Sequence, residues 1–160
     1  MEYAHTQRSP LHWFLIFIAI AFVAFGWQWS DGWAGRIAFI PIGGIVFLLS
    51  FCLAQLTVQD EGDFLALRYG PIPLFSKRIA FAEITEVRVA KSAVVDGWGI
   101  HYVPGRGWTY NLWGRDCAEL TLGTKTIRVG SDDVENLVAF LEQAMARERS
   151  PMERASSGSR

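Results

Sequence analysis

The residues best suited to a binding role are four basic side chains on two neighbouring predicted strands. Lys77 and Arg78 begin one strand, and Arg88 and Lys91 belong to the next. Basic side chains near a bilayer attract anionic lipid headgroups, at about 1 kcal/mol for each well-placed base. We therefore interpret these four residues as a candidate contact surface for anionic headgroups or a partner protein. The alternative is a solvated charged face, because exposed charges usually contribute little.

Two tryptophans extend this candidate surface. Trp98 and Trp108 stand in glycine-rich strings, and aromatic rings on the surface of a small domain are suited to ligand binding. The competing interpretation is structural, because large rings also fill the mouth of a small barrel. The sequence leaves both interpretations open.

Motifs for catalysis are missing from the sequence. The chain contains no Gly-x-Ser-x-Gly elbow, no Gly-x-x-x-x-Gly-Lys loop, no His-Glu-x-x-His and no Cys-x-x-Cys. Its histidines are too scattered to predict a metal site, and Cys117 has no histidine near it in the sequence. We therefore predict no enzymatic activity, no cofactor and no metal. A membrane enzyme assembled from distant residues, such as His101, Asp116 and Cys117, is the less favoured alternative.

The overall charge also limits the class of partner. The chain has 15 Lys and Arg residues against 16 Asp and Glu residues, for a net charge of −1. A balance this close provides no general attraction to nucleic acid. We therefore expect no nucleic-acid partner.

Two apolar stretches near the start of the chain indicate that the rest of the chain is anchored to a membrane. Leu11 to Trp29 and Ile37 to Leu56 each contain few charges, and each has about the 20 residues that a helix needs to cross a hydrocarbon core. The interval from Ser30 to Arg36 allows only a tight return. We therefore predict a transmembrane helical hairpin over residues 11–56, preceded by an N-terminal segment over residues 1–10.

A cleaved signal peptide is the alternative for the first stretch. The apolar region of a signal peptide is usually about 7 to 15 residues long and ends in small residues. The first stretch instead ends in Gly26, Trp27, Gln28 and Trp29. Tryptophan is typical of the membrane interface, so these ends favour a spanning helix.

The rest of the chain predicts one small, mainly β domain. Short β-rich runs separated by glycine and proline indicate about seven strands between residues 57 and 131. Apolar residues then recur at helical spacing from Val134 to Met145, with Asp132 as the expected N-cap. We predict a sandwich or partly open barrel, capped by this C-terminal helix, over residues 57–147. A disordered tail is expected over residues 148–160.

The predicted strands are defined by alternating apolar residues or by turn residues on both sides. They are Phe64–Tyr69, Lys77–Phe81, Ile84–Lys91, Gly99–Val103, Trp108–Leu112, a strand around Leu120, and Thr126–Val129.

Four strings in this domain carry a resemblance to a known family. They are Gly97-Trp98-Gly99-Ile100, Gly107-Trp108-Thr109-Tyr110-Asn111, Ala118-Glu119-Leu120 and Ile127-Arg128-Val129-Gly130-Ser131-Asp132. Together they resemble the bacterial pleckstrin-homology-like (PH-like) domains of small membrane proteins. The resemblance covers roughly residues 57–145, and it implies a fold and a membrane context without a reaction.

This resemblance and the positive charges together predict a location. The distribution of Lys and Arg slightly favours cytoplasmic placement of both chain ends. We therefore expect a multi-pass protein of the bacterial inner (cytoplasmic) membrane, with its β domain in the cytoplasm.

The predicted function is that of a membrane-anchored binding or scaffolding module. Confinement to a surface raises the effective concentration of a weakly binding partner. The alternatives are a module that binds lipid headgroups and, less favoured, a membrane enzyme or a transporter subunit. Gly43 and Gly44, with Ser50 and Ala54, also suit close helix packing, so a homo-oligomer through the second stretch is a further hypothesis.

Overall fold

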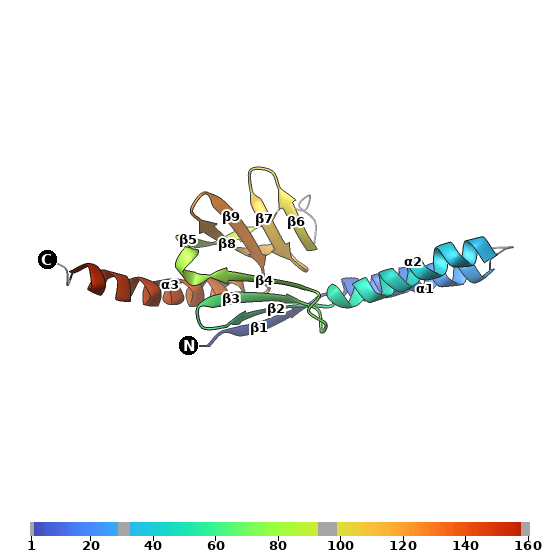
Figure 1. The fold of residues 1–160 in the computed structure, drawn as a ribbon, viewed down its shortest axis with the longest axis horizontal. Coiled ribbons are helices and arrows are strands. Elements are labelled where there is room, and N and C mark those ends of the chain that lie inside the picture. Colours follow the sequence, from blue (N-terminus) through green and yellow to red (C-terminus); the bar gives the residue numbers. More distant parts are fainter. Residues whose placement is uncertain (1, 29–32, 93–98, 158–160) are drawn as a thin grey trace.

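The computed structural model describes residues 2–28, 33–92 and 99–157 of the chain. Figure 1 shows a pair of helices at one end, two β-sheets in the middle and a long helix that ends at the opposite side. The predicted combination of an apolar N-terminal helix, a mainly β domain and a C-terminal helix is confirmed.

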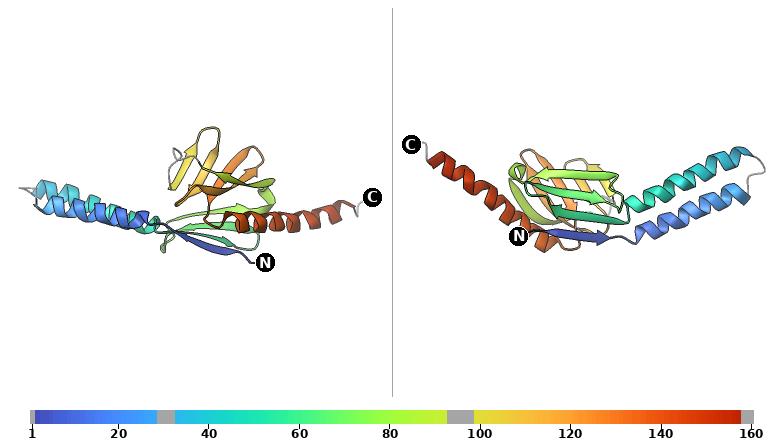
Figure 2. Two further views of the ribbon diagram at one scale, coloured as in Figure 1. Left: turned by 180° about the vertical axis from the view of Figure 1, so that it is seen from behind. Right: turned by 60° about the horizontal axis from the view of Figure 1, so that its bottom comes forward.

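The first two helices lie side by side and project away from the sheets (Figure 2). They are α1 (Leu11–Gln28) and α2 (Trp33–Cys52). Glycine permits their close approach, because a Cβ on Gly43 would lie 2.8 Å from Val23 Cγ2 and 2.9 Å from the Ala19 carbonyl oxygen. The packing of the pair therefore depends on the absence of a side chain at this position.

Both helices have apolar, exposed surfaces. Within the described part of the chain, α1 alone meets the length and hydropathy expected of a membrane span, and the apolar part of α2, Arg36–Cys52, is shorter. Trp13, Phe17, Ile37 and Ile45 are each more than half exposed. An apolar surface this extensive indicates contact with a membrane or with another protein.

The first sheet contains four antiparallel strands in the order β1-β2-β3-β4. Their bounds are β1 (Ala4–Arg8), β2 (Gln55–Asp60), β3 (Phe64–Tyr69) and β4 (Phe75–Ala80). β1 and β2 are neighbours, with Ala4 opposite Gln59 and Arg8 opposite Gln55. The chain therefore leaves this sheet after β1, passes through both helices and returns to the same sheet as β2.

This connection corrects two predicted boundaries. The segment over residues 1–10 is not separate from the domain, because β1 is an edge strand of the first sheet. The second helix ends at Cys52 rather than at Leu56, because Leu56 and Val58 belong to β2 and are buried in the domain core. An apolar run that continues directly into a core strand resembles one longer helix in the sequence.

The second sheet contains five strands in the order β5-β8-β9-β7-β6, and a short 3-10 helix, η1 (Phe81–Glu83), leads into it. The strands are β5 (Glu86–Lys91), β6 (Gly99–Val103), β7 (Gly107–Asn111), β8 (Asp116–Leu122) and β9 (Lys125–Gly130). Only the β7–β9 pair is parallel among the described strands. The described residues thus form nine strands, where the sequence predicts about seven.

The core lies between the two sheets and is closed by α3 (Val134–Ser157). Its fully buried side chains come from both sheets and from the helix, and they include Leu56, Leu67, Leu120, Val129 and Leu141. α3 packs against η1, β5 and β8. The predicted amphipathic helix is therefore confirmed, and its apolar face completes the core.

The two ends of α3 differ from the prediction. Asp132 is not the N-cap, because its Oδ1 lies 2.6 Å from His5 Nε2 and the first helical hydrogen bond runs from the Leu137 amide to the Asp133 carbonyl. The helix also continues to Ser157, so the disordered tail predicted from residue 148 is not seen over residues 148–157. Arginine, glutamate, methionine and alanine in this segment all have high helix propensity.

Candidate functional site

A groove lies between β4 of the first sheet and the strands of the second sheet. Figure 1 shows how these strands are placed relative to one another. One part has a volume of about 680 Å³ and is lined by Lys77, Tyr102, Trp108, Tyr110 and Lys125, among others. A second part of about 620 Å³ continues toward η1 and shares Lys77 and Lys125 with the first. We call this continuous hollow the inter-sheet groove.

The aromatic wall of the inter-sheet groove follows from strand register. Tyr102 of β6 lies opposite Trp108 of β7, and alternation along β7 places Tyr110 on the same face as Trp108. The ring centroids are 5.7 Å apart for Tyr102 and Trp108 and 6.4 Å apart for Trp108 and Tyr110. These spacings fall within the range of interacting aromatic pairs.

These rings are exposed although they lie on the inner face of the second sheet. Tyr102 of β6 pairs with Trp108 of β7, and Trp108 in turn pairs with Ile127 of β9, which is only 9 % exposed. Trp108 is 47 % and Tyr102 59 % exposed. The β6–β7 hairpin therefore extends the inner face of its sheet beyond the part that the core covers.

Two lysines line the same groove, one from each sheet. Lys77 comes from β4 and Lys125 from the start of β9. Both side chains are exposed, and neither makes an ion pair with any residue in the described part of the chain. Their ammonium groups are therefore available to an anionic ligand.

The other predicted basic residues are engaged in ion pairs. Arg78 lies beside Lys77 on β4, but its Nε is 2.8 Å from Glu61 Oε2. Lys91, at the end of β5, has its Nζ 3.6 Å from Asp116 Oδ1. β4 and β5 belong to different sheets, and β5 forms the edge opposite to β6. The four predicted basic residues therefore do not form one surface.

Arg88 belongs to an ion-pair network on the second sheet. Its Nε donates to Glu119 Oε1 at 2.8 Å, and Arg128 Nε donates to Glu119 Oε2 at 2.7 Å. Glu119 is only 5 % exposed. Burial disfavours its charged form, but hydrogen bonds and the positive charge from the two arginines hold the pKa of the Glu119 carboxyl below its ordinary value. This network stabilises the sheet rather than offering a free binding site.

Of the two predicted tryptophans, Trp108 lies in the inter-sheet groove and Trp98 lies outside the described residues. Tyr102, Tyr110 and Lys125 also line the groove, although they are not among the predicted contact residues. The hairpin pattern in the sequence could have identified Tyr102. Two strands joined by a short turn at Pro104 and Gly105 place Tyr102 opposite Trp108.

The catalytic alternative gains no geometric support. Cys117 on β8 and His101 on β6 are separated by β9 and β7, which corresponds to about 14 Å at the usual strand spacing. Cys117 is fully buried, and burial raises the pKa of its thiol to about 11. Within the described residues, no group of histidine, cysteine and carboxylate side chains is arranged to hold a metal ion.

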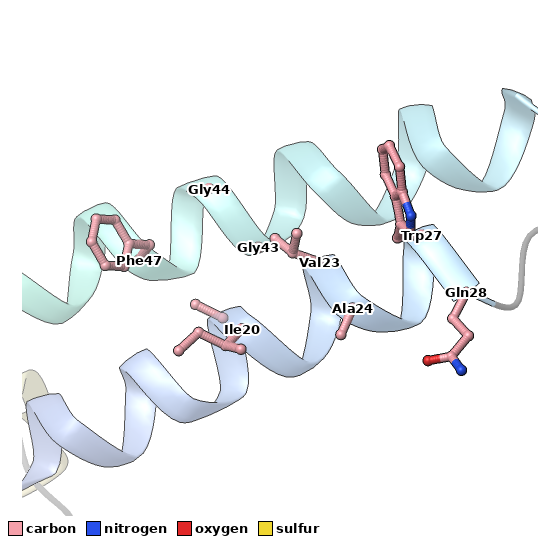
Figure 3. Close-up of a pocket in the computed structure, with 9 residues that line it drawn as sticks. Ile20, Val23, Ala24, Trp27, Gln28, Gly43, Gly44 and Phe47 are labelled. Atoms are coloured by element: carbon pink, nitrogen blue, oxygen red, sulfur yellow. The ribbon is translucent and has the colours of Figure 1, made fainter.

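The helical pair has a separate, mainly apolar groove, with Gln28 as its one amide side chain among the described lining residues. It has a volume of about 800 Å³, and Figure 3 shows its lining residues, among them Ile20, Val23 and Ala24 of α1 and Gly44 and Phe47 of α2. A Cβ on Gly44 would meet no atom within 4 Å, so this glycine leaves the groove open. Acyl chains or a second apolar helix would fill such a surface in a bilayer.

No protein-family model and no curated protein matches the chain. The fold and the groove define a mainly β domain of two sheets with a C-terminal helix and an inserted pair of apolar helices. The resemblance to bacterial PH-like domains stays a prediction from the sequence.

Proposed function

We propose that the protein is a membrane-anchored binding module whose inter-sheet groove receives an extended, acidic segment of a partner protein. In this proposal α1 and α2 cross the bacterial inner membrane as a two-pass hairpin, and the β domain has a PH-like fold on the cytoplasmic side. The observation that carries the proposal is the inter-sheet groove, which combines two exposed aromatic rings with two exposed lysines that form no ion pair with any described residue.

Spanning by both helices is supported by their exposed apolar surfaces and by their attachment. The Ser9 amide donates to the Ala54 carbonyl at 3.1 Å, so the chain enters and leaves the helical pair at one point of the domain. Ser9 Oγ also accepts from the Leu11 amide at 3.0 Å and caps the start of α1. A hairpin that returns to the same point suits two passes across one bilayer.

The signal-peptide alternative conflicts with the position of β1. β1 precedes α1 in the chain and pairs with β2 over five residue pairs, from Ala4–Gln59 to Arg8–Gln55. Cleavage after α1 would remove β1 from the sheet and leave the edge of β2 unpaired. The architecture therefore favours an α1 that is retained.

The chemistry of the groove favours an acidic, extended segment. β4 is an edge strand of the first sheet, and edge strands offer unpaired backbone groups to an added strand. Lys77 and Lys125 attract carboxylates, while Tyr102 and Trp108 offer faces for apolar or aromatic side chains. Anchoring beside the membrane strengthens such modest contacts by raising the effective concentration.

Site-specific photo-crosslinking in native membranes tests this proposal. A photoreactive phenylalanine analogue replaces Tyr102 in the full-length chain, and the same analogue replaces the exposed Phe64 of β3 as the matched control. We expect the Tyr102 position to capture a specific protein through an acidic segment. The purified segment should then bind the wild type and lose affinity for a Trp108→Ala, Lys125→Glu variant.

Two outcomes would overturn the groove as a partner site. One is crosslinking to lipid alone from the Tyr102 position, which would indicate headgroup binding. The other is an identical set of products from the Phe64 position, which would show that the groove has no specificity.

A further inference from the structure

The turn between β3 and β4 is an exposed apolar loop. It contains Pro71, Ile72, Pro73 and Leu74, and β4 then begins with Phe75. Ile72 is 55 %, Leu74 64 % and Phe75 47 % exposed. No charged residue occurs between Arg68 and Lys77. A soluble surface gains nothing from such a cluster, which is typical of contact with a membrane or a partner.

This turn lies against the end of the helical pair. The Gly70 amide donates to the Gln55 carbonyl at 2.7 Å, and a Cβ on Gly70 would lie 2.5 Å from the Phe51 carbonyl oxygen. Gly70 has φ +76°, so glycine is needed both for this backbone conformation and for the close approach to α2. Figure 1 shows the end of β3 and β4 next to the domain end of the helices.

The length of α1 sets the level of the turn relative to a bilayer. A helix of 18 residues is about 27 Å long, close to the thickness of a hydrocarbon core of about 30 Å. If α1 crosses the core, its first residue and the last turn of α2 lie at the boundary with the headgroups. The β3–β4 turn begins at that level because Gly70 contacts Phe51.

Two basic residues, Arg8 and Lys77, lie on the domain side of the turn. Arg8 is the last residue of β1 and lies opposite Gln55, whose carbonyl binds the Gly70 amide. Lys77 follows Phe75 by two residues on β4. Apolar side chains at the tip with cations behind them are the arrangement that suits the interface of an anionic bilayer.

We propose that the β3–β4 turn inserts Ile72, Leu74 and Phe75 into the interface of the bilayer that the helical pair crosses. This inference rests on the proposed two-pass anchor and adds a third contact between the protein and the membrane. The three contacts follow one another along one edge of the first sheet, because Arg8 lies opposite Gln55 and the Gly70 amide binds the Gln55 carbonyl. The added contact opposes tilting of the domain on the membrane surface. The inter-sheet groove is then presented to its partner in one orientation.

Spin-label depth measurements on the full-length protein in bilayers containing anionic lipid test this proposal. Single labels are placed at Leu74→Cys in the turn, Val89→Cys on β5 as the matched exposed control, and Phe17→Cys on α1 as the reference for spanning. All three side chains are at least half exposed, so the labels leave the core unchanged. Accessibility to oxygen is compared with accessibility to a water-soluble nickel complex.

We expect the Phe17 label at a depth inside the hydrocarbon, the Leu74 label at the interface, and the Val89 label in water. A Leu74 label as accessible to nickel as the Val89 label, with Phe17 still deep, would overturn the insertion of the turn and leave the anchor intact. A Phe17 label accessible to nickel would overturn the anchor itself, and the proposed insertion with it.

Discussion

Arg8 and Gln55 face each other as partners on neighbouring strands, although the entire helical pair lies between them in the chain. The helices are therefore an insertion into one sheet rather than an N-terminal addition to a separate domain. Such an insertion leaves no flexible linker between the helical pair and the β domain, because both connections continue directly into paired strands. The position of the domain relative to the helices is fixed by strand pairing.

Excision of the helical pair is expected to leave a folded domain. Replacing residues 9–54 with Asn-Gly joins Arg8 to Gln55 through a two-residue turn, which is the connection preferred by antiparallel neighbours. We expect a soluble protein with a cooperative thermal transition, measured by circular dichroism. A shorter variant that also lacks residues 1–8 should have a free energy of unfolding lower by about 3 kcal/mol, because it loses β1 and the stacking of Tyr3 on Phe140. Equal stability of the two would contradict the role given to β1.

Glu119→Gln should destabilise the domain in a pH-dependent way. At neutral pH, we expect a loss of about 3 kcal/mol in the free energy of unfolding, because Arg128 then keeps its charge without a buried partner. The pKa of Glu119 is lowered by folding, so its stabilising effect is present above the ordinary pKa of 4.5 and is lost as pH falls through the folded value. The difference between wild type and variant in urea denaturation should therefore shrink below about pH 4.5.

A matched control for this network is Asp116→Asn. Asp116 pairs with Lys91 at the surface, where an ion pair contributes about 1 kcal/mol or less. We expect little change in unfolding free energy at any pH. A loss as large as that of Glu119→Gln would show that burial is not the deciding factor.

Two glycines in the β6–β7 hairpin should respond differently to alanine. Gly107 has φ +82°, and a Cβ there would lie 2.0 Å from the Thr126 carbonyl oxygen across the parallel β7–β9 pair. Gly105 has a similar φ of +75° but open space around it. Gly105→Ala should lower the free energy of unfolding by about 1 to 2 kcal/mol through backbone strain alone. Gly107→Ala should lower it clearly more, because strain and the clash with Thr126 add. Equal losses in thermal denaturation would contradict the close packing of β7 on β9.

Substitutions at the neighbouring glycines Gly43 and Gly44 of α2 should distinguish packing between the helices from filling of the apolar groove. Gly43→Leu is expected to increase the distance between spin labels on α1 and α2, because a side chain there meets Val23 and Ala19. Gly44→Leu should leave that distance unchanged, because it points into the open apolar groove. If a second copy fills this groove, Gly44→Leu will also reduce chemical crosslinking between chains. Unchanged crosslinking would count against an oligomer formed through this surface.

The parts of the fold that the sequence predicts well are those with local signals. β3 and β6 coincide with predicted strands, because turn residues delimit each of them. β2 was hidden because Leu56 and Val58 follow an apolar helix without a break in composition. β1 was missed because it is short and polar, and its partner lies beyond two helices. Long-range pairing of this kind has no local signature.

The candidate site was only partly predictable for a related reason. Lys77 and Trp108 are conspicuous in the sequence, but their proximity depends on how the two sheets are placed relative to each other. Arg88 is equally basic, and its partner Glu119 belongs to a strand 31 positions further along the chain. Residue type therefore suggested the candidates, while register and sheet packing decided which of them share a groove.

The proposed anchor requires the helices inserted between β1 and β2 to cross the bilayer twice and to hold the domain on one side. Accessibility of single cysteines to a membrane-impermeant maleimide in spheroplasts tests it directly, since the native Cys52 and Cys117 are buried. We expect Asp31→Cys, between α1 and α2 in the sequence, to be labelled in intact spheroplasts, and Lys125→Cys in the inter-sheet groove to be labelled only after the membrane is disrupted. Labelling of both cysteines, or of neither, before disruption would contradict the two-pass anchor with a cytoplasmic domain.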